Sequence, residues 1–238
     1  MGLFDSISSK AKVKTANKKA QAARATKDVA QADKLFAEAI AIYGSIASDN
    51  GAFKDALYNW GVTLLHRARS KEGAEAIGMY EDAGKRFSYC LVAKEDYLAA
   101  ALDWSAALME LAPLQDESER EATYALAKEK MTIANDIQEG VASYNLACLH
   151  AVHGDFDACK ESLEAALAYQ NLPDEEDIIN DADMQIAKTQ VWFDGFIASI
   201  SAPEEDEDTE GESDEAAESN VAYSKSKIKK SKYKADYD

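Results

Sequence analysis

The sequence predicts an all-α fold in which about three to four antiparallel helix pairs stack into a solenoid. Helix-breaking residues are scarce, since only 3 of the 238 residues are proline and 11 are glycine. A small residue, a bulky apolar residue four positions later and a second small residue three positions after that also recur along the chain. Repeated helix pairs of this kind are typical of solenoids. The four copies of this trio are Ala32–Phe36–Ala39, Ala83–Phe87–Cys90, Ala127–Met131–Ala134 and Cys159–Leu163–Ala166.

Two helices are expected at the start of the chain, over residues 2–27 and 28–47. The first has apolar side chains at helical spacing near its start and a basic face supplied by lysines. The second has an apolar stripe that runs from Val29 to Tyr43. The sequence Ser-Asp-Asn-Gly at residues 48–51 indicates a stop and a turn.

Three clearer helix pairs follow, and their spacing supports repetition. In two of them, the small residues of the first and second helices are 22 positions apart, from Gly61 to Ala83 and from Ser105 to Ala127. In the last pair this interval is 12, so the other two share an extension of ten residues. The expected helices span residues 53–68 with 74–93, 96–111 with 117–137, and 141–152 with 155–169.

A triplet on each first helix gives these pairs a packing reason. Its small third residue lets the two helices approach closely, and the large apolar residue before it fills the volume beside the contact. The bulky residue of the second helix closes the same layer from the other side. The triplets are Asn59–Trp60–Gly61, Asp103–Trp104–Ser105 and Asn145–Leu146–Ala147.

The chain changes character after the last pair. The sequence Asn-Leu-Pro-Asp at residues 171–174 ends that pair, and an apolar helix over about 181–200 is expected to cap the open end of the stack. Residues 204–218 hold ten acidic residues and no basic one, which predicts disorder. The predicted organisation is a basic amphipathic helix at 1–27, a repeat domain at 28–202 and a disordered acidic, then lysine-rich, tail at 203–238.

The net charge of −18 is divided unevenly along the chain. Residues 1–27 carry seven basic residues and one acidic residue, whereas residues 28–203 hold a net charge of −18. An acidic body disfavours nucleic acid as the main ligand, because phosphate contacts need clustered lysine and arginine.

The sequence also bears on the compartment. The three cysteines, Cys90, Cys148 and Cys159, lie within apolar helical patterns and favour a reducing compartment. The chain has no run of about 18–20 apolar residues that would span a membrane, and no secretory leader. The expectation is a soluble cytoplasmic protein.

No residue pattern predicts catalysis, a cofactor or a metal. The chain shows no nucleophile paired with a base and no glycine loop of the kind that holds phosphate. Cys148, His150, His153 and Cys159 lie close in sequence, but a structural metal site needs four ligands in a tetrahedron. On one helix Cys148 and His150 would diverge, and Cys159 belongs to the packing trio. Ordinary packing with two surface histidines is the preferred interpretation.

Over about residues 28–200 these patterns resemble the tetratricopeptide repeat. The stretch from Tyr144 to Phe196 looks like the variant that closes an array of such repeats. The resemblance implies a right-handed helical stack whose concave groove binds peptides or protein surfaces, with no catalysis and no cofactor. The helix pair that matches best does so through Asn145-Leu146-Ala147, Gly154-Asp155-Phe156, Cys159, Leu163 and Ala166.

The resemblance also implies which residues line that groove. Asn59 and Asn145 stand where family members often contact a partner's backbone. One subset of the family grips the C-terminal carboxylate of heat-shock chaperones with basic residues, but Tyr58, Leu102 and Tyr144 stand at those positions here, so such capture is not expected. Two alternatives stay open: the chain's own terminal helices fill the groove, or these residues only pack. The predicted partner-binding residues are Tyr58, Asn59, Val62, Leu102, Met109, Tyr144 and Asn145.

The N-terminus supports a second hypothesis. Residues 1–6, Met-Gly-Leu-Phe-Asp-Ser, fit the pattern for myristoylation at Gly2. The lysines that follow would supply the second signal that a single acyl chain needs at an anionic membrane. The alternative is a first repeat helix with a frayed start. The sequence thus predicts an adaptor that binds an apolar or amphipathic protein segment, or else a peripheral membrane scaffold attached through residues 1–27.

Overall fold

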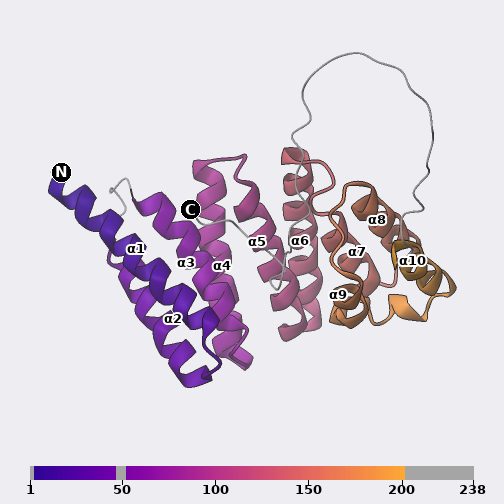
Figure 1. The fold of residues 1–238 in the computed structure, drawn as a ribbon, viewed down its shortest axis with the longest axis horizontal. Coiled ribbons are helices and arrows are strands. Elements are labelled where there is room, and N and C mark those ends of the chain that lie inside the picture. The colour runs from indigo at the N-terminus through magenta and orange to yellow at the C-terminus, as the bar shows by residue number, and fades with distance from the viewer. Residues whose placement is uncertain (1–2, 47–51, 202–238) are drawn as a thin grey trace, which may run out of the picture. The chain divides into compact units, whose positions relative to one another are not determined.

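The structure is a computed structural model that describes residues 3–46 and 52–201. These residues form ten α-helices and short 3-10 turns, with no strand among them, which confirms the all-helical prediction. The chain divides into two compact units, Met1–Leu172 and Pro173–Asp238. The helices of the first unit are α1 (Leu3–Ala25), α2 (Val29–Gly44), α3 (Phe53–Ala68), α4 (Gly73–Ala93), α5 (Leu98–Leu111), α6 (Glu117–Ile137), α7 (Ser143–Val152) and α8 (Phe156–Ala168) (Figure 1).

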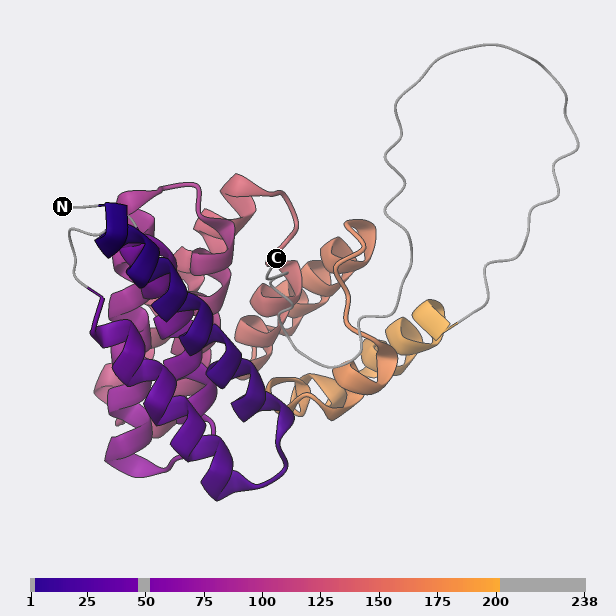
Figure 2. The ribbon, with the colours of Figure 1, turned by 60° about the vertical axis from the view of Figure 1, so that its left-hand side comes forward.

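Successive helices of the first unit pack against each other in chain order. Four antiparallel pairs form in this way: α1 with α2, α3 with α4, α5 with α6 and α7 with α8 (Figure 1). Each pair also contacts the next, through α2 and α3, α4 and α5, and α6 and α7. Figure 2 shows α1 lying along α2. The N-terminal basic helix is thus the first helix of a pair.

Aspartate side chains cap three of the second helices. Asp28 begins α2, Asp116 begins α6 and Asp155 begins α8, each by accepting a hydrogen bond from a backbone N–H two or three residues later. Such caps satisfy N–H groups that have no partner within the first turn, and each typically contributes about 1 kcal/mol. They fix where these helices start.

The first predicted trio is shifted by seven residues from the position that matches the other three. Phe36 and Ala39 are buried as expected, but Ala32 is only half-buried. The most deeply buried set is Ala39, Tyr43 and Ile46, in which the bulky Ile46 takes the place of the second small residue and lies just beyond the end of α2. Phe36 and Tyr43 lie two turns apart on one face of α2, so the helical spacing alone fits either position. With this correction, all twelve residues of the four trios are at most 4% exposed.

The corrected trios of α2, α4 and α6 recur every 44 residues, from Ala39 to Ala83 to Ala127. The same interval separates the contacts that the bulky residues make with the first helix of their pair. Tyr43 donates a hydrogen bond to Asn17 Oδ1 at 2.6 Å, and 44 residues later the Phe87 ring lies against Gly61. α1 therefore holds the same place against α2 that α3 holds against α4.

The second unit does not contain the single apolar helix expected over residues 181–200. The first helical segment ends at Asp181, whose backbone is extended, and the Asp181 carboxylate caps the following 3-10 turn by accepting a hydrogen bond from the Asp183 N–H. The Lys188 ammonium bonds the carbonyl of Ile179 at 2.7 Å and stabilises the bend that follows. The elements are α9 (Glu175–Asn180), 3-10 turns at Ala182–Met184 and Ala187–Thr189, and α10 (Val191–Ser201).

Candidate partner-binding face

The predicted partner-binding residues come from the first helices of three successive pairs. Of these helices, α3 also contacts α5 directly. We call the seven residues the first-helix face. α3 supplies Tyr58, Asn59 and Val62, α5 supplies Leu102 and Met109, and α7 supplies Tyr144 and Asn145.

Three members of the first-helix face are buried. Tyr58 is 5% exposed, Val62 6% and Tyr144 7%. The Tyr58 ring packs against Tyr97, with the ring centroids 5.0 Å apart, and its hydroxyl donates a hydrogen bond to Asp103 Oδ2 at 2.7 Å. Tyr58 therefore joins α3 to α5 inside the protein and leaves little of its ring for a partner.

The other four members are half-buried and more accessible. Asn59 donates from Nδ2 to the Asp55 carbonyl at 2.8 Å, which commits half of its carboxamide. The Asn145 carboxamide makes no hydrogen bond to another described residue. Leu102 and Met109 lie at the edge of the core that α5, α6 and α7 form. A partner would meet two apolar side chains and two asparagines on this face.

Asp103 places a carboxyl group beneath this face, on α5. The residue is 6% exposed, and burial raises the pKa of the carboxyl to about 6, although the Tyr58 hydrogen bond and the charge of Arg69 both act to lower it. Burial disfavours the ionised form because water no longer solvates it. Asn59 stands 44 residues earlier, so the preceding pair has a neutral amide where this pair has an acid.

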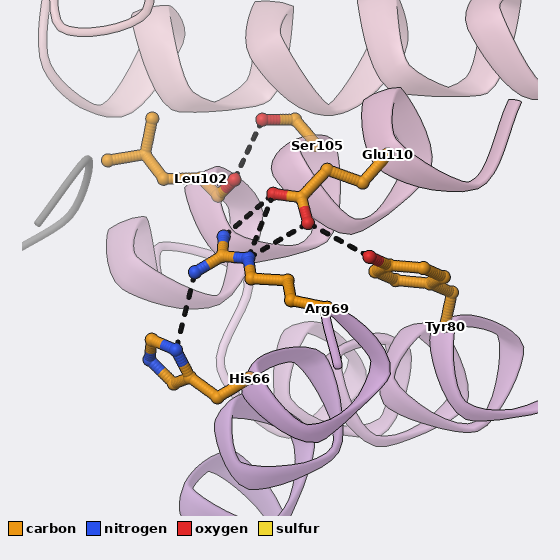
Figure 3. Close-up of polar contacts among 6 residues, drawn as sticks. All are labelled: His66, Arg69, Tyr80, Leu102, Ser105 and Glu110. Atoms are coloured by element: carbon orange, nitrogen blue, oxygen red, sulfur yellow. Dashed lines mark hydrogen bonds and ion pairs between the residues drawn. The ribbon is translucent and has the colours of Figure 1, made fainter. Parts of the chain in front are cut away.

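A polar cluster of His66, Arg69, Tyr80 and Glu110, the Arg69 cluster, ties α3, α4 and α5 together (Figure 3). Arg69 donates from Nη2 to Glu110 Oε1 at 2.7 Å and from Nε to Glu110 Oε2 at 2.9 Å. The Tyr80 hydroxyl donates to Glu110 Oε2 at 3.1 Å. This two-pronged pairing fixes both the distance and the orientation of the arginine.

His66 is the neutral member of the Arg69 cluster. Burial, together with the charges of Arg69 and Arg24, lowers the pKa of its imidazole to about 3. Arg69 Nη1 lies 3.3 Å from His66 Nδ1. Because an arginine can only donate, Nδ1 accepts and the ring proton sits on Nε2. A group with this pKa does not exchange protons near neutral pH, so the cluster suits a structural role.

His150, His153 and Cys159 have separate surroundings, and Cys148 is buried. His153 Nδ1 lies 2.7 Å from a backbone carbonyl of its own helix, and its Nε2 faces Glu121 at 3.4 Å. His150 Nδ1 faces Asp155 at 3.8 Å. Cys159 is fully buried in the α8 trio. These contacts give the two histidines and Cys159 roles in pairing or packing.

The sequence reasoning missed a cation stacked on each of two tryptophans. The Arg86 guanidinium carbon lies 4.1 Å from the Trp60 ring centroid, and the Lys130 ammonium lies 4.4 Å from that of Trp104. The two cations are 44 residues apart, as the two tryptophans are. Each cation directly precedes the bulky residue of a trio. The 44-residue interval that the cations share with the tryptophans was therefore the sequence signal that could have identified the two stacks.

Comparisons with family models, curated proteins and solved structures found no match to this chain. Across residues 3–46 and 52–201, no helix is both long and apolar enough to cross a bilayer. Gly2, the predicted myristoylation site, and the predicted tail at 203–238 lie outside the described residues.

Proposed function

We propose that the helix pairs of residues 3–172 form a tetratricopeptide-like solenoid and that the protein is a non-catalytic adaptor. The observation that carries the proposal is the recurrence of the buried trios, every 44 residues in α2, α4 and α6 and with the same internal spacing in α8. Repeats stacked in this way bury a continuous core and leave their first helices side by side. Proteins of this kind use the resulting extended surface to bind other proteins.

The chemistry of the first-helix face supports an apolar or amphipathic protein segment as the ligand. Leu102 and Met109 stand two turns apart on α5 and offer apolar contacts. A carboxamide can pair with both the N–H and the C=O of a bound backbone, and Asn145 has that capacity uncommitted among the described residues. The nearby His66 is neutral and adds no charge for the ligand to match.

Two variants of the full chain test this face. Leu102→Asp with Met109→Asp introduces charge, and Asn59→Ala with Asn145→Ala removes the carboxamides. A protein that the wild-type chain retains from native lysate is purified, and its affinity for each variant is measured by calorimetry. Loss of two hydrogen bonds of about 1 kcal/mol each weakens binding roughly 10–30-fold in the alanine variant. The aspartate variant binds more weakly still, because it sets charges against an apolar segment.

The matched control is Tyr89→Asp with Val92→Asp on α4. These side chains are 59% and 84% exposed, so the control adds the same charge while removing little buried area. Far-ultraviolet circular dichroism identifies the variants that keep their helices. A partner that binds both folded face variants with wild-type affinity would place its site elsewhere and overturn the proposal.

A further inference from the structure

The outer side of α1 carries a stripe of positive charge. α1 has six basic residues and one acidic residue. Its inner side is used within the protein, where Val13 and Ala16 are buried in a cluster shared with α2. Lys10, Lys14 and Lys18 are exposed at intervals of about one helical turn. These three residues form the lysine stripe.

The lysine stripe has no counter-charge in the described part of its own chain. None of its three ammonium groups forms an ion pair with a described residue, whereas the neighbouring Lys19 pairs with Glu38 at 2.5 Å. Like charges four residues apart destabilise a helix by about 0.2–0.5 kcal/mol for each pair. The stripe extends over about 12 Å, and a partner with negative charges at matching intervals would relieve its repulsion.

A complementary surface lies on α8. Its outer side carries Asp157, Glu161 and Glu164, which are exposed and about one turn apart. Asp157 and Glu161 form no ion pair with a described residue, and Glu164 faces Lys160 at 3.6 Å. This acidic stripe extends over about 10 Å, so its length matches that of the lysine stripe.

We infer that the lysine stripe of α1 docks on the acidic stripe of α8 in a second copy of this chain. α1 belongs to the first helix pair and α8 to the last pair of the same unit. The contact is therefore head-to-tail, and each end of a dimer keeps one stripe free for a further copy. The first-helix face takes no part in this contact, so the inference stands apart from the proposed function.

Charge favours a second copy over an anionic membrane as the occupant. Residues 28–203 carry a net charge of −18, which opposes the approach of the body of the protein to negatively charged lipid. Another copy carries the same net charge, but its α8 stripe presents carboxylates at intervals that match the lysine stripe, which a fluid lipid surface does not. Val13, Ala16 and Ala20 of α1 are packed in the protein, so these three residues add nothing to insertion in a bilayer.

Charge reversal in the full chain tests the contact by sedimentation velocity. At about 0.05 M salt the wild-type chain self-associates, and association falls as salt rises to about 0.5 M. Reversing the charges of either stripe, on α1 or on α8, weakens association at least about tenfold, because like charges then face each other. An equal mixture of the two variants associates again, since each reversed stripe fits the other. The α1 reversal is Lys10→Glu, Lys14→Glu and Lys18→Glu, and the α8 reversal is Asp157→Lys, Glu161→Lys and Glu164→Lys.

The matched control is Lys54→Glu with Lys94→Glu and Lys128→Glu, three exposed lysines outside α1, which gives the same net charge as the α1 reversal. The control associates as the wild type does. A wild-type chain that stays monomeric at low salt, or a mixture that fails to associate, overturns the inference. The inference is also overturned if the α1 reversal self-associates as the wild type does and loses only its binding to vesicles of phosphatidylserine and phosphatidylcholine. The aspartate variant of the first-helix face self-associates normally, which separates failure here from failure of the adaptor proposal.

Discussion

The α3–α4 and α5–α6 pairs share one arrangement and differ in the layer where their helices meet. Both stack a cation on a tryptophan, and both bury a bulky trio residue completely. The α3–α4 pair combines Gly61 with Phe87, and the α5–α6 pair combines Ser105 with Met131 at the same positions 44 residues later. A rigid ring leaves no room for a side chain opposite, whereas a flexible thioether does. The small and bulky positions are therefore matched as a set.

The polar residue before each tryptophan also differs between the two pairs. Asn59 bonds the carbonyl four residues back in its own helix, whereas Asp103 accepts from Tyr58 of the preceding pair. The α3–α5 contact thus includes a buried carboxyl, whose ionised form is costly at that depth. The comparison separates residues that build each pair from a residue that joins one pair to the next.

The largest expected effect comes from replacing Gly61 of α3 with serine, the residue that α5 has at the equivalent position. A Cβ at Gly61 would lie 2.7 Å from Phe87 Cε1, so Gly61→Ser forces the ring to move within a filled core. We expect the free energy of unfolding to fall by about 3 kcal/mol, measured by urea denaturation. Adding Phe87→Met, which copies the α5–α6 pair, should recover much of this loss. A double variant no more stable than Gly61→Ser would show that the two positions are not matched.

A smaller effect of opposite sign on the free energy of unfolding is expected when Asp103 of α5 is replaced by asparagine, the residue that α3 has at the equivalent position. The pKa of Asp103 is about 6 in the folded protein, above the ordinary 3.8, so the folded state binds this proton more tightly than the unfolded chain does. Its stabilisation is complete below pH about 4 and is lost as pH rises through about 6. Asp103→Asn removes this slope and should raise the free energy of unfolding at pH 7 by roughly 2 kcal/mol.

The Asp103→Asn substitution keeps the contact with α3, because an amide oxygen accepts from Tyr58 as a carboxylate does. Its Nδ2 can donate to the Ala99 carbonyl, as Asn59 does to Asp55. Urea denaturation across pH 4–7 measures how the free energy of unfolding depends on pH. The reciprocal control is Asn59→Asp, which places an acid at the equivalent, half-buried position of α3. If wild type and Asp103→Asn show the same pH dependence, another group is responsible for it.

The helices were predictable because local signals agree with the packing. α6 begins and ends at the residues that the sequence indicated, since Asp116 caps it and apolar residues recur at helical spacing. The first trio was misplaced because Phe36 and Tyr43 share a face of α2, and only the position of α1 decides between them.

The candidate face was harder to predict than the helices. Periodicity shows which side of a helix is apolar, but it does not show which neighbour covers that side. Tyr58 fits a groove by its spacing, yet its hydroxyl reaches Asp103, 45 residues away in the sequence. Arg86 and Lys130 escaped notice because a cation that stacks on an indole interrupts an apolar pattern.

The smallest expected effects concern these two stacked cations. Lys130 donates to Glu129 at 2.6 Å while it lies over Trp104. In contrast, Arg86 Nε and Trp60 Nε1 are buried with no hydrogen-bond partner among the described residues. An unpartnered N–H costs free energy and offsets part of the stacking attraction. We therefore expect Lys130→Ala to lower the free energy of unfolding by about 1.5 kcal/mol and Arg86→Ala by only about 0.5 kcal/mol.

Urea denaturation of the two alanine variants measures this difference, and Trp60→Leu completes a double-mutant cycle with Arg86→Ala. Leucine is the residue that the α7–α8 pair uses at this position, as Leu146, where Ser162 replaces the cation. Ser162→Ala is the matched control and should leave the free energy of unfolding unchanged within about 0.5 kcal/mol. If the two alanine variants lose equal free energy of unfolding, the unpartnered N–H groups cost nothing. If the effects of Trp60→Leu and Arg86→Ala are strictly additive, the stacked pair contributes no coupling energy.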